Sequence, residues 1–275
     1  MKLGLGVGLS SVKDVCDELA RENPVLKDLS FLSLGFRQSD VIDPLIPSLT
    51  RSAGIEVAIH AIELNVTDEI DQNILTLLRS NADKLDAKWI EQDIGMWMWG
   101  NMYLGGHLLN PIENFDWAEI IARNVTKCKN STDRQFLLEN PPVYFRTGDC
   151  SLWDLLECAA EQTGAGIVFD VGHAIGYAIN TQSKDLLPSS NWGGWQFVKE
   201  LHFSGFDIIN VRGHKLWMDK HQLPFSAELL EVGRKVIELL GPEIPICLEL
   251  DGASVSTRDM NIEAIREVVM SVDGG

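Results

Sequence analysis

The stretch SLWDLLECAAEQTGAGIVFDVGHA, residues 151–174, decides the fold class. Its first part, Ser151–Thr163, has apolar residues at helical spacing and predicts an amphipathic helix. Its second part, Gly166–Asp170, is a short continuous apolar run, which is typical of a parallel strand covered on both faces. The run ends in Asp170, and His173 lies just beyond it. Helix and buried strand together are the repeating unit of an α/β fold.

The same alternation continues along the whole chain of 275 residues. Further strand-like runs are predicted at Leu3–Leu9, Leu29–Phe36, Ile55–His60, Lys88–Ile94, Gln135–Glu139, Val198–Ser204 and Ile246–Asp251. Further helical segments are predicted at Asp68–Leu85, Trp117–Lys127, Ser226–Leu240 and Asn261–Val272. Eight strand-like runs in a chain of this length match a (β/α)8 barrel of the TIM type. A doubly wound open sheet is the competing fold, but no linker-like stretch divides the chain, so we predict an α/β protein in which residues 1–275 form a single barrel domain.

Charge and cysteine content exclude several classes of protein. Forty acidic residues against 23 basic ones give a formal net charge of −17, which repels the phosphates of nucleic acids and anionic membranes. The five cysteines are scattered without CxxC spacing, which argues against a disulfide framework or a zinc finger and favours a reducing compartment. The first residues lack the features of a secretory signal, and no stretch approaches the roughly 20 apolar residues that a membrane span needs. We therefore expect a cytoplasmic protein that binds neither nucleic acid nor membrane.

Carboxylates and imidazoles follow the predicted strands, whose carboxyl ends meet at one mouth of a barrel. They are His60, Asp93, Glu139 with Asn140, Asp170 with His173, Glu200, His202, Glu249 and Asp251, together with Asp219 and His221 in a predicted loop. A single histidine of this kind is best explained by a structural hydrogen bond, but a converging set would repel or stay unpaired without cations. Mixed histidine and carboxylate ligands suit iron, manganese or zinc. The carboxylates outnumber what one zinc ion uses, so the set predicts two or three metal ions that share bridging carboxylates.

Six motifs follow one another in the order of the chain. They are IHAIEL (59–64), LLENPPVYF (137–145), GIVFDVGHA (166–174), KELHFSGF (199–206), MDKHQLP (218–224) and CLELDG (247–252). Together they resemble the multinuclear non-haem iron-dependent oxidative enzymes, a family that includes the methanobactin-type and thiaglutamate-type peptide-modifying oxidases. The resemblance implies a xylose-isomerase-like barrel that holds two or three iron ions in mixed Fe(II) and Fe(III) states and uses dioxygen as co-substrate. It further implies oxidation of a residue, usually cysteine, in a ribosomally synthesised precursor peptide, with a separate partner protein that recognises the leader of that peptide.

Position by position, the resemblance implies a set of metal ligands. They are His60, Asp93, Glu139, Asp170, His173, His202, Asp219, His221 and Glu249. Glu139 is expected to bridge ions, and Glu139, Asp93 and Asn140 are expected to serve the reaction directly. Asp93 departs from the family pattern, which has a histidine there, and a harder anionic ligand favours a more oxidised ion. The residues expected to orient the ligands or to face the substrate are His107, Glu200 and Asp251.

Two other classes of function are consistent with the residues alone. The first is a redox-inert enzyme with two or three zinc or manganese ions on the same barrel, either a sugar isomerase or epimerase or a phosphodiesterase-like hydrolase. Such an enzyme needs lysines and arginines near its site, and these are sparse among the strand-end motifs. The second is a metal-binding subunit without catalytic activity, which agrees less well with so complete a set of ligand types. Iron content and colour separate the oxidase from the redox-inert enzyme.

Overall fold

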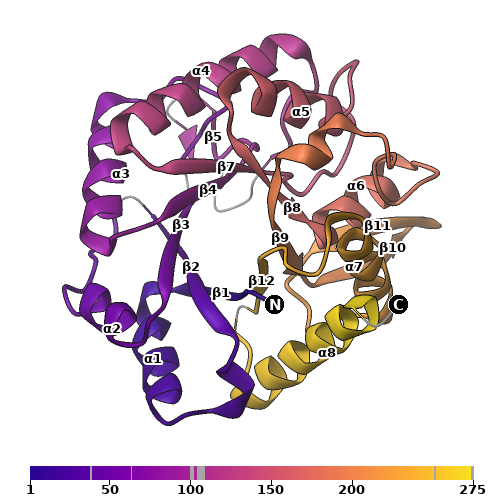
Figure 1. Ribbon diagram of the computed structural model, residues 1–275. Coiled ribbons are helices and arrows are strands. Elements are labelled where there is room, and N and C mark those ends of the chain that lie inside the picture. The colour runs from indigo at the N-terminus through magenta and orange to yellow at the C-terminus, as the bar shows by residue number, and fades with distance from the viewer. Residues whose placement is uncertain (38, 63, 100–101, 104–108, 251, 274–275) are drawn as a thin grey trace.

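The computed structural model describes residues 1–37, 39–62, 64–99, 102–103, 109–250 and 252–273. Its centre is a closed barrel of parallel strands with helices around the outside (Figure 1). Neighbouring strands follow the order β1-β12-β9-β8-β7-β4-β3-β2. The strands are β1 Leu3–Gly8, β2 Leu29–Arg37, β3 Glu56–Ile62, β4 Trp89–Asp93, β7 Gln135–Glu139, β8 Gly166–Asp170, β9 Val198–Ser204 and β12 Ile246–Glu249. The predicted (β/α)8 barrel is therefore confirmed.

Helices connect the strands and cover the barrel from outside. They are α1 Val12–Ala20, α2 Ile46–Ser52, α3 Gln72–Leu85, α4 Phe115–Thr132, α5 Leu152–Thr163, α6 Val171–Thr181, α7 Ala227–Leu240 and α8 Val255–Asp273. Short 3-10 helices are η1 Leu9–Ser11, η2 Pro24–Leu26 and η3 Gly193–Phe197. The segments predicted from periodicity overlap α3, α4, α5, α7 and α8. At the start of α5, the Ser151 side chain accepts the backbone N–H of Asp154 while the Asp154 carboxylate accepts the N–H of Ser151. Such a capping box is a sequence signal for the start of a helix, which explains why this helix was predictable.

Helix α6 is the most informative of the helices that sequence analysis missed. Every residue from Val171 to Ala178 is buried. A short, mostly apolar segment directly after a strand cannot be assigned to a helix by periodicity alone, so this helix was not predicted. His173, expected in a loop after the strand, lies instead in the first turn of this helix.

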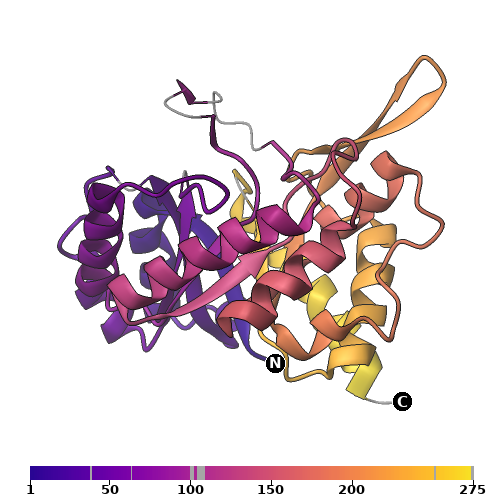
Figure 2. The same cartoon turned by 90° about the horizontal axis from the view of Figure 1, so that it is seen from above.

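A two-stranded antiparallel hairpin follows β9 and projects from the barrel (Figure 2). Its strands are β10 Phe206–Val211 and β11 His214–Asp219. A much smaller hairpin pairs β5 Met98–Trp99 with β6 Met102–Tyr103. The prediction that Asp219 lies in a loop was wrong, because Asp219 is the last residue of β11. Trp217 is completely buried, since it packs against Gly176 of α6.

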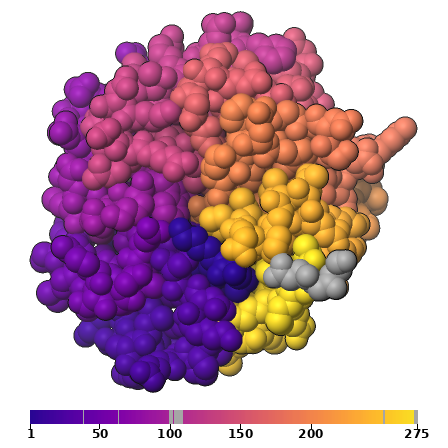
Figure 3. Space-filling view, in the orientation of Figure 1, coloured from indigo at the N-terminus to yellow at the C-terminus, as the bar shows by residue number. Residues whose placement is uncertain are grey.

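The parallel strands place the polar residues at one end of the barrel. The first residues of the chain lie near the middle of one face of the molecule, beside helix α8 (Figures 1 and 3). The carboxyl ends of the strands therefore lie at the opposite face. Buried apolar side chains such as Leu34, Phe136 and Ile167 form the hydrophobic core.

Two features that the sequence argued against are also not found in the described structure. No helix in the described part of the chain is long and apolar enough to cross a membrane. All five cysteines are free thiols, and four of them are buried.

Candidate metal centre

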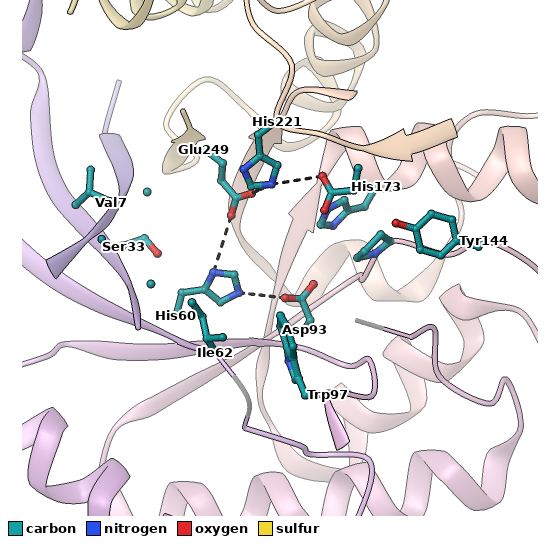
Figure 4. Close-up of a pocket in the computed structure, with 15 residues that line it drawn as sticks. Val7, Ser33, His60, Ile62, Asp93, Trp97, Tyr144, His173, His221 and Glu249 are labelled. Carbon is teal, nitrogen blue, oxygen red and sulfur yellow. Dashed lines mark hydrogen bonds and ion pairs between the residues drawn. The ribbon is translucent and has the colours of Figure 1, made fainter. Parts of the chain in front are cut away.

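A cavity of about 420 Å³ lies at the carboxyl ends of the barrel strands (Figure 4). The histidines and carboxylates that line it are His60, Asp93, His173, Asp219, His221 and Glu249. The close-up shows His60 between Asp93 and Glu249, with His221 on the far side of Glu249. These residues come from β3, β4 and β12, from the first turn of α6, and from the end of β11 and the segment after it.

His60 stands among three carboxylates. Its Nε2 lies 3.1 Å from Asp93 Oδ2 and 3.6 Å from Glu139 Oε2. Its Nδ1 lies 4.0 Å from Glu249 Oε1. Asp93 and Glu139 are register partners on the paired strands β4 and β7, so the sheet itself sets them side by side. One ligand atom each from His60, Glu139 and Glu249 lie within 4.8 Å of one another, which is close enough to share one ion.

His202 on β9 is completely buried and faces two groups of carboxylates. Its Nδ1 lies 3.2 Å from Glu139 Oε1 and 3.2 Å from Glu249 Oε1. Its Nε2 lies 3.3 Å from Glu200 Oε1 and 3.8 Å from Glu91 Oε2. Nδ1 is thus the nitrogen available to an ion at the centre. A carboxylate behind the other nitrogen fixes the tautomer of a ligating histidine and raises its basicity.

His173 is oriented by the backbone of Asn140. Its Nδ1 lies 2.9 Å from the Asn140 carbonyl, which only accepts hydrogen bonds, so Nδ1 carries a ring proton. Nε2 is then the nitrogen left for an ion, and it lies 3.8 Å from Asp219 Oδ2. The Asn140 side chain donates to the Asp170 carbonyl at 2.9 Å and accepts the Asp170 N–H at 2.8 Å. Asn140 therefore orients His173 and Asp170, and its side-chain amide is occupied by these bonds.

Asp170 is both the last residue of β8 and the N-cap of α6. Its Oδ1 accepts the His173 N–H at 2.5 Å and the Ser204 hydroxyl at 2.8 Å. Its Oδ2 is buried and has no hydrogen-bond partner among the described residues. One oxygen thus fixes the start of the helix, while the other is left for a cation.

The segment after β11 returns to the mouth of the barrel and leaves it open on this side. His221 adopts a left-handed backbone conformation, φ 44°, which is uncommon outside glycine and marks a tight change of direction. Its Nε2 lies 3.4 Å from Asp219 Oδ1 and 3.3 Å from Glu249 Oε2. The side chains of His221 and Asp219 are 24% and 25% exposed, so solvent reaches the centre here.

Many buried polar atoms at the centre lack hydrogen-bond partners within the described residues. They are Asp93 Oδ1, both Glu139 oxygens, Asp170 Oδ2, His173 Nε2, both ring nitrogens of His202, Glu200 Oε1 and Asp219 Oδ1. Each unpaired buried group costs roughly 1–3 kcal/mol. Bound cations would remove this cost for the atoms that face the centre, because carboxylate oxygens and imidazole nitrogens are metal ligands, whereas His202 Nε2 and Glu200 Oε1 face each other at 3.3 Å.

Glu139 is common to three groups of potential ligand atoms. It is grouped with His60 and Glu249, with Asp93 and His173, and with Asp170 and His202. In each group one atom from every residue lies within 4.8 Å of the others. The residues therefore fit a cluster of ions that meet at the Glu139 carboxylate.

Burial shifts the pKa values of this cluster strongly. Burial, reinforced by the charge of Asp93, raises the pKa of Glu139 to about 8, and burial raises the pKa of Asp170 to about 6. Burial alone would lower the pKa of His60, but its hydrogen bond to Asp93 and the charges of Glu139 and Glu249 raise that pKa to about 10. Without metal, the cluster therefore holds protons that an incoming ion must displace.

Sequence analysis missed Glu91, which lies in a buried layer beneath the centre. Glu91 is completely buried on β4 and accepts the indole N–H of Trp89 at 3.1 Å and the hydroxyl of Ser33. Alternate residues of a strand face the same side, so Glu91 and Asp93 both face the barrel interior. A glutamate two residues before a predicted ligand in an apolar strand is the signal that could have revealed it.

Glu200 belongs to the same buried layer. Burial and the charge of Glu91 raise the pKa of Glu200 to about 7. One ligand atom each from Glu200, His202 and Cys247 lie within 4.8 Å of one another. Because Glu200 lies behind the Nε2 of His202, its position agrees with the expectation that it orients this histidine.

The side of the cavity formed by β1 and β2 carries none of the predicted ligands. Gly8 and Gly35 line it. A Cβ on Gly8 would meet nothing within 4 Å, and one on Gly35 would meet only Ile62 Cδ1 at 3.6 Å. Trp97 and Tyr144 line other parts of the same cavity. On this side, two glycines flanked by Val7 and Ser33 therefore face space that a substrate can occupy.

The structure brings all nine predicted metal ligands to one place. Six of them line the cavity, and the other three, Glu139, Asp170 and His202, are completely buried, each within 4 Å of at least one of those six. Their roles as ligands stay predictions. Two other predicted residues, His107 and Asp251, lie outside the described residues.

A family model described as "RiPP precursor modification enzyme MbnB/TglH/ChrH" matches residues 36–269. The chain belongs to this family. The matched range includes every residue of the proposed centre, and the resemblance inferred from the motifs is confirmed. RiPP precursors are ribosomally synthesised peptides, so the substrate class of this family is a peptide.

Comparisons with individual proteins agree with membership of the RiPP precursor modification family and with the barrel. The chain is 24% identical over 252 residues to a UPF0276 protein of Vibrio parahaemolyticus, which covers 86% of this chain and 82% of the relative. Endonuclease IV from Thermus thermophilus superposes with a TM-score of 0.62 at 15% identity, over 98% of this chain and 100% of that one. A xylose isomerase-like TIM barrel protein from Mycobacterium smegmatis, in complex with magnesium, gives 0.60 at 13% identity, over 95% and 90%. At these identities the solved structures show the fold alone.

Proposed function

We propose that the chain is a multinuclear iron, O2-dependent oxidase that modifies a cysteine of a ribosomally synthesised precursor peptide. The observation that carries the proposal is the sharing of Glu139 by three groups of potential ligands at the mouth of the barrel. A carboxylate that bridges ions is what a multinuclear centre needs. Membership of a peptide-modifying enzyme family supports the peptide as substrate.

The donor set supports iron over softer metals. The proposed ligands are five carboxylates, Asp93, Glu139, Asp170, Asp219 and Glu249, and four imidazoles, His60, His173, His202 and His221. Nitrogen and oxygen donors of this kind suit iron or manganese, whereas thiolates select softer ions. Asp93 adds negative charge, which favours an oxidised ion in a mixed-valent cluster.

The residues of the chain bind and orient, while the ions would supply the redox chemistry with dioxygen and coordination of the substrate sulfur. Asn140 holds His173 and Asp170 through its carbonyl and its side-chain amide. Glu200 stands behind His202 and keeps its Nδ1 aimed at the centre. Trp97 and Tyr144 border the cavity and exclude water from part of it.

A redox-inert isomerase, epimerase or phosphodiesterase on the same barrel is the alternative. Such enzymes hold sugars or phosphates with cationic side chains. No lysine or arginine is found among the described residues that line the cavity. This lining favours a substrate without phosphate.

Metal content and colour test the proposal. Protein expressed in iron-supplemented medium is analysed by ICP-MS and by optical spectroscopy. We expect two to three irons per chain with ferric charge-transfer bands, and a loss of iron in His60→Ala and His202→Ala. His214→Ala is the matched control, because His214 is exposed on the hairpin and should leave the iron count unchanged. One iron or fewer, with zinc or manganese in its place and no colour, would contradict the oxidase and favour the alternative.

A further inference from the structure

The β10–β11 hairpin extends from the proposed metal centre into the solvent. Its two-residue turn, Arg212-Gly213, has positive φ at both positions, 51° and 86°, which is the geometry of a tight type I′ hairpin. At the root of the hairpin, Phe206 pairs with Asp219, which lines the cavity. Figure 2 shows the hairpin standing away from the rest of the barrel. A molecule bound along this hairpin would therefore have one end at the mouth of the barrel.

The outer edge of β11 is covered by α6. Asn180 accepts the Trp217 N–H at 2.9 Å and donates to the Trp217 carbonyl at 3.3 Å. The backbone groups of Trp217 thus point away from β10. In an antiparallel pair, outward-facing and inward-facing residues alternate. Asn210 and Lys215, the cross-strand pair two residues further toward the tip, therefore also turn their backbone groups outward.

The outer edge of β10 is open at Asn210. Its backbone N–H and carbonyl have no hydrogen-bond partner within the described part of the chain. The neighbouring side chains of Ile209 and Val211 are 40% and 47% exposed and lie on one face of the ribbon. An open strand edge with exposed apolar side chains is a template for a further strand.

The outer part of the hairpin, residues 208–218, is locally positive in an acidic chain, whereas the two carboxylates of the hairpin, Asp207 and Asp219, lie at its root. Residues 208–218 contain Arg212 and Lys215 and no carboxylate, while the whole chain has a formal charge of −17. Such a patch attracts acidic groups and repels basic ones. The overall charge alone would favour a basic peptide, so the hairpin selects the opposite kind of segment.

We propose that the outer edge of β10 binds an acidic, extended segment of the precursor peptide by strand addition and leads that peptide to the mouth of the barrel. The inference rests on the proposed function only for the peptide nature of the substrate. The distance from Asn210 to Phe206 is about 13 Å along an extended strand. A segment that pairs at Asn210 and extends four or five residues along β10 thus reaches the root of the hairpin beside Asp219, where it displaces the Asp207 carboxylate that accepts the outward N–H of Ile208 at 2.8 Å.

Proline substitutions at the two members of one cross-strand pair test this edge. Asn210→Pro removes the outward N–H of β10, and Lys215→Pro removes the outward N–H of β11. Neither N–H belongs to the ladder between the two strands, and edge strands tolerate proline at such positions. The two variants are therefore matched in position along the hairpin and differ in the edge that they change.

The binding assay uses two fluorescein-labelled synthetic peptides of ten residues and the full-length, metal-free chain. One peptide alternates valine with glutamate, and the other alternates valine with lysine. Fluorescence anisotropy should show that the glutamate peptide binds at least about fivefold more tightly than the lysine peptide. Asn210→Pro should weaken binding of the glutamate peptide by about fivefold, as expected for one or two lost hydrogen bonds, and Lys215→Pro should weaken it no more than Lys215→Ala, which removes the same charge and keeps the N–H.

Three outcomes would overturn the proposal. They are a loss of affinity in Lys215→Pro that exceeds the loss in Lys215→Ala by as much as Asn210→Pro loses, equal affinity for both peptides, and a wild-type dimer that Asn210→Pro abolishes, which would make a second copy of the chain the occupant. If circular dichroism shows that a proline unfolds the hairpin, Val211→Ser replaces it, with Leu239→Ser as control, since Leu239 is exposed to 45% on α7. The assay needs neither metal nor turnover, so its result is independent of whether the chain is an iron oxidase.

Discussion

At position 139 a glutamate is completely buried, and neither carboxylate oxygen has a hydrogen-bond partner among the described residues. Burial raises its pKa to about 8, so its ionised form destabilises the metal-free fold. The same carboxylate is the proposed bridge between ions. Glu139→Gln should therefore raise the unfolding temperature of the metal-free protein at pH 9 by about 3 °C, roughly 1 kcal/mol for a chain of this size. It should also reduce the metal content to one ion or fewer, as measured by calorimetry and ICP-MS.

Glu113→Gln is the control for this prediction. Glu113 is equally buried, but it accepts from Arg146 Nε at 2.8 Å and belongs to none of the ligand groups. Its substitution should lower the unfolding temperature, because the Arg146 guanidinium loses its partner, and should leave the metal content unchanged. A full complement of ions in Glu139→Gln would show that Glu139 does not bridge them.

Helix α6 and strand β11 pack into one unit that positions ligands from both. Gly176 leaves room for Trp217, because a Cβ on Gly176 would lie 2.5 Å from the indole ring. Gly176→Ala should displace Trp217 and, with it, Asp219 two residues later. We expect a loss of about 1–3 kcal/mol of stability, typical of overpacking, together with a reduced metal content. Unfolding curves and ICP-MS measure both effects.

Gly35→Ala is the comparison for this helix–strand contact. A Cβ on Gly35 meets only Ile62 at 3.6 Å, which is an ordinary contact. This variant should keep both its stability and its ions. If Gly176→Ala loses stability but keeps every ion, the packing of α6 against β11 does not position the ligands.

Several barrel strands, such as β8 and β12, were predictable because they are short, mainly apolar runs. The predicted and observed bounds agree completely for β9, Val198–Ser204, and for β8, Gly166–Asp170. Helix α6 was not predictable in this way, since periodicity alone cannot assign a short, mostly apolar segment directly after a strand to a helix. Strand β11 was missed because Trp217 is buried against a helix that sequence analysis had itself missed. Errors in neighbouring elements were therefore linked.

Part of the candidate site was predictable from a single rule about parallel strands. Parallel strands end at the same mouth, so polar residues such as His60, Asp170 and Glu249 could be grouped without coordinates. Glu91 could not be found by this rule, because its depth depends on the tilt and stagger of the strands. The orienting bonds of Asn140 depend on its backbone carbonyl, whose direction the sequence does not reveal.

Without metal, the buried groups in the barrel of the folded protein bind more protons than the same groups bind in the unfolded chain. The stability of the whole molecule should therefore depend on pH. The folded pKa of His60 is about 10 and that of Glu139 about 8, both above their ordinary values of 6.5 and 4.5. The folded state thus binds extra protons, and their stabilising contribution is lost as the pH rises through these values. The pKa of Asp219 is lowered, because His173 and His221 lie beside it and outweigh burial, so its stabilising contribution is lost only at acid pH. The metal-free protein should therefore be most stable near pH 5–6 and less stable at pH 9.

Thermal unfolding between pH 5 and pH 9 measures this dependence. We expect the unfolding temperature of the chelator-treated protein to fall by about 5 °C or more from pH 6 to pH 9. The iron-loaded protein should show a much flatter profile, because bound ions have already displaced the protons. Glu139→Gln should reduce the slope of the metal-free protein, which separates the buried cluster from general repulsion in a chain of charge −17. Identical slopes with and without iron would contradict the linkage.

The side of the cavity formed by β1 and β2 is separate from the predicted metal ligands and faces the space that a substrate can occupy. Gly8 and Gly35 have ordinary negative-φ or extended backbones, and each has room for a Cβ. A single codon change at either position would reshape the mouth by one methyl group or more and leave every predicted ligand in place. Relatives that diverged toward different peptides would then carry the record of that divergence at these two positions. The predicted metal ligands would be the same in all these relatives.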